Sequence, residues 1–113
     1  MKRKHRRTTK SVGDNYERRV ARKMRYRGFL FVRVSGKSGD YGADVMARDL
    51  LLRKIVVQCK CYNGRVGVGA VQEIHAAKTF YDAQRAAVAT NSKFTKAARE
   101  LAYKLNVELW ERY

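Results

Sequence analysis

Apolar residues repeat at helical spacing in three segments of the chain, and alternate or run continuously in five others. In the first helical segment, Tyr16, Val20 and Met24 recur every four residues and therefore lie on one face. The apolar run 55–57 is β-branched throughout, which is typical of a central strand. Thr95 is a suitable N-cap for the last helix. The pattern predicts helices over 14–27, 69–82 and 95–106, and strands over 29–34, 43–48, 53–62, 86–90 and 107–110.

The order of these segments constrains the topology. A helix comes first, then three strands, and then helix, strand, helix and strand. Three consecutive strands with short connections can form an antiparallel meander, whereas a strand that follows a helical crossover usually pairs in parallel. We therefore predict an α/β fold with a mixed five-stranded sheet and helices on both faces.

The length of 113 residues and the hydrophobic content of 45% fit a single small domain. Residues 1–13 are rich in Lys and Arg and poor in apolar side chains, so we predict a disordered basic arm there. The remaining residues, 14–113, would form the domain.

The charge of the chain indicates a polyanionic partner. The formal net charge is +16, and residues 1–27 alone carry twelve Lys or Arg against two acids. We interpret the arm as a non-specific phosphate clamp; a nuclear localisation signal or a solvated tail without a role are the alternatives. The candidate DNA-binding residues of the arm are Lys2, Arg3, Lys4, Arg6, Arg7 and Lys10.

Several classes of protein do not fit this sequence. No segment approaches the roughly 18–20 apolar residues of a membrane span, and no apolar stretch follows the basic N-terminus as in a signal peptide, so we expect a cytoplasmic protein. Cys59 and Cys61 lie two apart in an apolar run, which predicts buried thiols rather than a disulfide or a zinc site.

The predicted central strand carries unusual polar residues. Because side chains alternate along a strand, Gln58 and Lys60 share one face, and burying them unpaired would cost several kcal/mol. Asp44 begins the preceding strand, and a hairpin of this length can place it beside Gln58. With the backbone carbonyl of Cys59, these oxygens suit Mg²⁺, and Lys60 would contact a scissile phosphate and the attacking water. The alternative is an exposed strand face.

Two short motifs resemble a known family. Gly-Ala-Asp at 42–44, followed by Val-Gln-Cys-Lys at 57–60, resembles the PD-(D/E)XK nuclease superfamily in its Mrr-type restriction endonuclease branch, where Gln often replaces the usual Glu. Further matches are 68–73, after the Lys, and 89–98, before the last helix. The resemblance extends over about 14–110, and it implies a restriction-endonuclease-like fold.

The resemblance also implies roles for individual residues. Asp44 and Gln58 would be metal ligands, and Lys60 would be the catalytic cation. In this family an acid on the first helix often completes the metal site, and Glu17 holds that position. Gln72 matches a position that faces the site, where it would contact the substrate or support Lys60.

Some of these residues have structural interpretations as well. Glu17 fits a capping box that begins at Asp14. Asp40 is an alternative to Asp44 as the metal ligand. Glu73 is expected at the surface. In the Gly/Ser-rich loop before Asp44, the candidates for phosphate contacts are Ser35, Lys37 and Ser38.

These observations predict a metal-dependent DNA endonuclease that uses Mg²⁺, with Mn²⁺ as a substitute, and that selects DNA by structure rather than by sequence. Archaeal Holliday junction resolvases are similar to it in their core, although they carry Glu at the position of Gln58. A homodimer is expected, with strand 107–110 as a sheet edge for pairing. The alternative function is a non-catalytic, basic nucleic-acid-binding protein.

Overall fold

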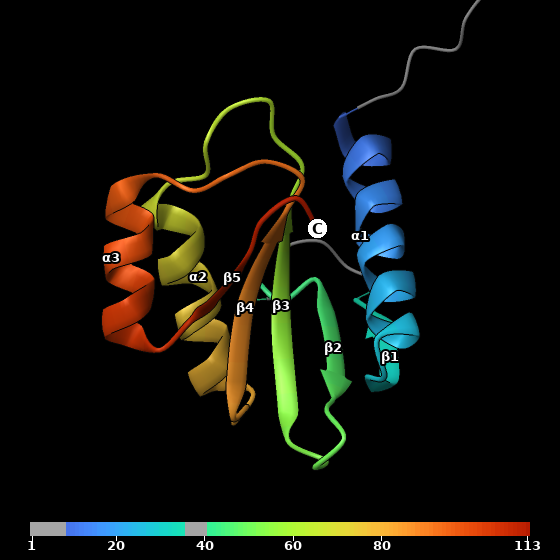
Figure 1. Cartoon of the computed structure of the whole chain (residues 1–113). Coiled ribbons are helices and arrows are strands. Elements are labelled where there is room, and N and C mark those ends of the chain that lie inside the picture. The colour runs from blue at the N-terminus through green and yellow to red at the C-terminus, as the bar shows by residue number, and fades with distance from the viewer. Residues whose placement is uncertain (1–8, 36–40) are drawn as a thin grey trace, which may run out of the picture.

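The computed structural model describes residues 9–35 and 41–113 of the chain (Figure 1). The elements follow one another in the predicted order. They are α1 (Thr9–Tyr26), β1 (Leu30–Val34), β2 (Val45–Arg48), β3 (Lys54–Lys60), α2 (Val68–Phe80), β4 (Arg85–Thr90), α3 (Lys96–Leu105) and β5 (Glu108–Trp110).

The strands form a mixed sheet in the order β1-β2-β3-β4-β5. β1, β2 and β3 pair antiparallel as a meander, whereas β4 pairs parallel to β3, and β5 parallel to β4. Figure 1 shows α1 on one side of the sheet and α2 and α3 on the other. The predicted α/β architecture is therefore confirmed. No helix within residues 9–35 and 41–113 is long and apolar enough to span a membrane.

The start of α1 differs from the prediction. The helix begins at Thr9, five residues before the predicted start at 14, so residues 9–13 belong to this helix rather than to an irregular arm. Asp14 lies inside the helix and cannot be its N-cap, so the capping-box interpretation of Glu17 is wrong. Residues 1–8 lie outside the described part of the chain, and the prediction for them stays a prediction.

The core lies in two layers, one on each face of the sheet. Val56 packs in the layer of α2 and α3, whereas Ile55 and Val57 pack in the layer of α1. This alternation confirms the two faces predicted for the central strand. Cys59 packs partly against the α1 layer, but Cys61 is exposed, so the prediction of a buried thiol is wrong there. The reason is that β3 ends one residue earlier, and the chain leaves the sheet.

Local hydrogen bonds set the ends of α3. The Thr95 side chain accepts from the Ala98 amide at 3.0 Å, which confirms the predicted N-cap. At the other end Asn106 is the C-cap, with φ of 57° in the left-handed region that Asn tolerates better than most residues.

Asp49 closes the turn between β2 and β3. Its carboxylate accepts from the amides of Leu51 and Arg53, both at 2.9 Å, and from Arg53 Nε at 2.8 Å. Arg85 Nη1 donates to it at 3.3 Å. Burial alone would raise the pKa of Asp49, but the hydrogen bonds from Arg53, Arg85 and Leu51 outweigh burial and lower the pKa to about 2.

Candidate active site

One cavity of about 550 Å³ brings the predicted site residues together. Asp44 immediately precedes β2, Gln58 and Lys60 lie on β3, and Glu17 comes from α1. All four line the cavity, together with residues of α2 and of the segment before β2. The full lining is Glu17, Tyr41, Gly42, Asp44, Gln58, Cys59, Lys60, Glu73 and Ala76.

Backbone hydrogen bonds fix Asp44 between β1 and β3. Its amide donates to the Val57 carbonyl at 2.8 Å, and its carbonyl accepts from the Ser35 amide at 2.8 Å. Its Oδ2 accepts from the Cys59 amide, also at 2.8 Å. The hairpin thus places Asp44 beside the middle of the Gln-Cys-Lys motif, as its length predicts.

The electrostatics of Asp44 favour a cation in the cavity. Burial raises the pKa of Asp44, and the charge of Glu73 raises it further. The Cys59 amide, the Lys60 charge and a hydrogen bond with Glu17 lower this pKa. Burial has the larger effect, so the pKa of Asp44 is raised overall. Two carboxylates close to each other repel, and a divalent cation between them would remove this repulsion.

Gln58 presents an unsatisfied oxygen at the cavity. The residue is only 5% exposed, and its Nε2 donates to Glu73 Oε1 at 2.7 Å. Because an ionised carboxylate only accepts, Glu73 determines which end of the amide faces α2. Oε1 of Gln58 is buried and has no hydrogen-bond partner among the described residues. A buried acceptor left in this state costs about 1–3 kcal/mol, which a ligand at that oxygen would recover.

Glu73 is a site residue that the sequence interpretation missed. Its side chain is 58% exposed, as a surface residue would be, yet it contacts Gln58 and lies 3.9 Å from Lys60 Nζ. Gln72, which we expected at the site, is exposed and does not line the cavity. One signal in the sequence could have indicated this role: Glu73 directly precedes Ile74, which is buried. Glu73 therefore lies at the border of the apolar stripe of α2.

Gly42 allows the segment before β2 to approach α2. Its φ is +83°, and a Cβ at this position would lie 3.2 Å from the carbonyl oxygen of Glu73. The same Cβ would lie 3.3 Å from the Cβ of Glu73. The glycine of the Gly-Ala-Asp motif therefore has a steric role: it lets the chain that carries Asp44 pack directly on the helix that carries Glu73.

The chemistry of the donors fits a hard divalent cation. Carboxylate and amide oxygens from Asp44, Glu17 and Gln58 line the same cavity, and such oxygens are the ligands that Mg²⁺ prefers. Within residues 9–35 and 41–113, no three His, Cys, Asp or Glu side chains converge tightly enough to hold a metal by themselves. The amide oxygen of Gln58 adds a third side-chain oxygen to the two carboxylates that line this cavity.

The remaining candidates have other positions. Burial, followed by the charges of Asp44 and Glu17, raises the pKa of the Cys59 thiol, so this thiol stays protonated and is a poor nucleophile. Lys10 lies in the first turn of α1. Outside the described residues lie Lys2, Arg3, Lys4, Arg6, Arg7, Lys37, Ser38 and Asp40.

Several solved structures share this fold at low sequence identity. AF1548, described as a protein of unknown function, has a TM-score of 0.71 at 20% identity, over 84% of this chain and 55% of that one. EndoMS in complex with dsDNA has a TM-score of 0.67 at 15% identity, over 97% and 48%. A repair endonuclease from Pyrococcus abyssi has a TM-score of 0.63 at 17% identity, over 97% and 49%. The chain thus spans about half the length of these proteins, and the fold is restriction-endonuclease-like.

The family follows from the sequence itself. The family model Mrr_cat, described as a restriction endonuclease, matches residues 9–113. The chain therefore belongs to the Mrr_cat restriction endonuclease family, which confirms the predicted resemblance. No curated protein matches the sequence significantly.

Proposed function

We propose that this protein is a divalent-metal-dependent DNA endonuclease that hydrolyses phosphodiester bonds, with Mg²⁺ as its ion and Mn²⁺ as a substitute. The observation that carries the proposal is the buried, unsatisfied Oε1 of Gln58 in the cavity that Asp44 also lines. Family membership supports endonuclease chemistry. EndoMS, a protein of the same fold, is known in complex with double-stranded DNA, which supports DNA as the substrate.

Four groups would hold the ion: the carboxylates of Asp44 and Glu17, Oε1 of Gln58 and the backbone carbonyl of Cys59. When bound, the ion polarises the phosphate and lowers the pKa of a coordinated water. Because Gln58 is neutral, the site carries one negative charge fewer than a site with Glu, and we expect weaker Mg²⁺ binding.

The residues of the chain supply the rest of the chemistry. Lys60 places a positive charge at the cavity, where it would stabilise the negative charge that develops on the phosphate oxygens in the transition state. It would also orient the attacking water. Glu73 contacts both Lys60 and the amide of Gln58, so it is a positioning residue that holds the two groups in one arrangement.

We further propose that substrate choice depends on DNA structure rather than on sequence, with branched junctions among the candidate substrates. The net charge of +16 supports strong binding to the DNA backbone, which carries no sequence information. Cutting both strands requires two active sites, so we propose a homodimer. β5 is the strand at one edge of the sheet and is available for pairing with a second copy.

Incubation with supercoiled plasmid tests the proposed activity. Mg²⁺ should give nicked and linear DNA, and EDTA should abolish cleavage. Asp44→Asn and Lys60→Gln should lose cleavage but keep DNA binding, because the distributed charge supplies affinity. The matched controls are two exposed positions: Asp82→Asn, in the turn after α2, and Lys104→Gln, on α3. Binding without cleavage under all metal conditions would support the non-catalytic alternative instead.

A further inference from the structure

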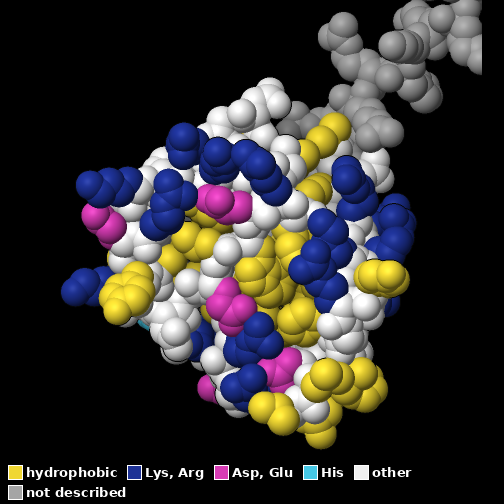
Figure 2. All heavy atoms as spheres, in the orientation of Figure 1, with side chains coloured by type: hydrophobic (Ala, Val, Ile, Leu, Met, Phe, Trp, Pro, Cys, Tyr) yellow, Lys and Arg dark blue, Asp and Glu magenta, His cyan; other side chains and the backbone are white. Residues whose placement is uncertain are grey.

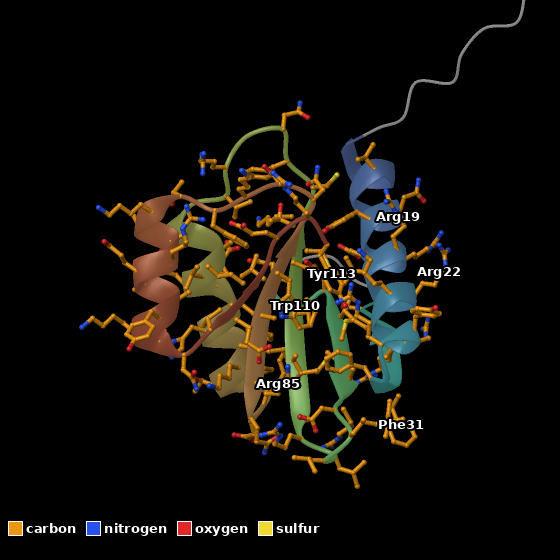
Figure 3. All side chains as sticks on the ribbon, in the orientation of Figure 1. Arg19, Arg22, Phe31, Arg85, Trp110 and Tyr113 are labelled. Atoms are coloured by element: carbon orange, nitrogen blue, oxygen red, sulfur yellow. The ribbon has the colours of Figure 1, made fainter. Side chains whose placement is uncertain are left out.

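The outer face of α1 carries a dense row of positive charge. Residues 18–27 contain six Lys or Arg and no acid. Val20, Ala21 and Met24 are buried against the sheet, so the charged positions of this helix face outward. Figure 2 shows Lys and Arg side chains gathered over this helix, and Figure 3 labels two of them. We define the α1 arginine row as the exposed residues Arg18, Arg19 and Arg22.

Among the described residues, three arginines outside α1 pair with carboxylates, whereas the α1 arginine row does not. Arg53, Arg85 and Arg99 each form an ion pair with a carboxylate. Within residues 9–35 and 41–113, the α1 arginine row forms no such pair. Its charge is therefore free to attract an external anion.

This concentration of charge is unfavourable for the helix by itself. Arg18 and Arg22 stand at i and i+4, and Arg19 and Arg22 at i and i+3, where like charges repel one another and destabilise a helix. A polyanion bound along the row would remove this repulsion. The apolar face of α1 is already buried in the core. This helix therefore has no apolar face that could insert into a membrane surface.

The row begins one position along the chain from a residue that lines the candidate active site. Glu17 lines the cavity, and Arg18 is its neighbour in sequence. At a rise of about 1.5 Å per residue, positions 18–22 extend about 6 Å along the helix axis. One DNA strand advances about 3.4 Å per nucleotide, so the row matches about two successive phosphates.

We propose that the α1 arginine row binds the phosphate backbone of duplex DNA beside the active site and so fixes the register of the bound duplex. This inference rests on the proposed function, because it takes the duplex to be the substrate of the same cavity. The row was not among the DNA-binding residues that the sequence predicted.

The test is the salt dependence of binding to a fluorescently labelled duplex in EDTA, where no metal-dependent cleavage occurs. The variant Arg18→Gln/Arg19→Gln/Arg22→Gln removes three charges from the row. The control Lys96→Gln/Arg99→Gln/Lys104→Gln removes three charges from exposed positions of α3, on the other side of the sheet (Figure 1). Circular dichroism and thermal unfolding verify that both variants are folded.

Each phosphate contact contributes about 0.9 to the slope of log affinity against log salt. The row variant should lose about 1.8–2.7 from this slope, and the control less than about 0.9. The melting temperature of the row variant should equal or exceed that of wild type, because repulsion within α1 is relieved. A purely structural role would lower it.

Equal slope changes in the two variants would overturn the inference, as would a row variant with the wild-type slope. Anionic vesicles that bind wild type but not the row variant, with unchanged DNA binding, would assign the row to a membrane surface and overturn it too. The inference and the proposed function can fail independently. If wild type cuts plasmid but the row variant keeps the wild-type slope, only the inference about the row is wrong.

Discussion

Gly42→Ala tests whether the contact between the Gly-Ala-Asp motif and α2 organises the site. The substitution adds a methyl group at a φ of +83°, a left-handed conformation that costs an L-residue about 1–2 kcal/mol. The new methyl carbon would also lie 3.2–3.4 Å from three atoms of Glu73, two of them in the backbone. Backbone atoms of a packed helix cannot rotate away, so the segment before β2 and α2 must separate.

The conformational cost alone should lower the stability by at least about 1 kcal/mol, or at least about 4 °C in melting temperature for a chain of this size. Separation from α2 would also loosen the 2.7 Å hydrogen bond between Glu73 and Gln58. We therefore expect plasmid cleavage to fall by more than DNA binding does, since binding depends on charge distributed over the whole chain.

Gly69→Ala is the matched control. A Cβ at Gly69 meets nothing within 4 Å, and this glycine lies in the first turn of α2. The substitution should stabilise the protein by about 0.5–1 kcal/mol, because alanine favours a helix more than glycine does. Urea unfolding should therefore shift in opposite directions for the two variants. A Gly42→Ala protein as stable and as active as wild type would refute the reasoning.

Three further substitutions test other parts of the structure. Tyr16→Phe removes a buried hydroxyl that has no hydrogen-bond partner among the described residues, so urea unfolding should show equal or higher stability; a loss above about 1 kcal/mol would contradict this. Asp49→Asn should be less stable than wild type at pH 6. This difference in stability should disappear between about pH 4 and pH 2, because the pKa of Asp49 in the folded protein, about 2, lies below the ordinary 3.8. A difference that is constant with pH would contradict the lowered pKa of Asp49. Glu73→Ala should lower plasmid cleavage about 10–100-fold with little change in stability, because it frees the amide of Gln58; unchanged cleavage would exclude a positioning role.

The sequence predicted the elements and the sheet because local patterns determine them. The β-branched run at 55–57 is typical of a buried strand, and Thr95 caps α3 through a hydrogen bond to the amide three residues later. Alternation on β3 also placed Gln58 and Lys60 on one face. The start of α1 was missed because residues 9–13 carry no apolar periodicity, which was the signal used to find the helix.

The candidate site was predictable where it depends on the β2–β3 hairpin and missed where it depends on helix packing. Asp44 reaches the end of β3 because the hairpin register determines its position. The choice between Gln72 and Glu73 depends instead on the rotation of α2 against the sheet, which no local pattern specifies. The role of Gly42 likewise becomes visible only when the backbone of α2 lies beside it.

We propose the amide oxygen of Gln58 as a ligand of the catalytic ion, and this claim can be tested directly. The double variant Gln58→Glu/Glu73→Gln tests it while keeping the net charge and a hydrogen bond between the two positions. It moves one negative charge from the exposed helix position to the buried ligand position. Gln58→Leu removes the proposed ligand altogether and keeps a side chain of similar size.

The measurement is the Mg²⁺ concentration that gives half-maximal plasmid cleavage, determined for wild type and both variants after thermal unfolding has verified their folding. We expect the double variant to need less Mg²⁺ than wild type, because a charged oxygen binds the ion more tightly. Gln58→Leu should lose most of its cleavage at every Mg²⁺ concentration. Three superimposable titration curves would contradict the claim.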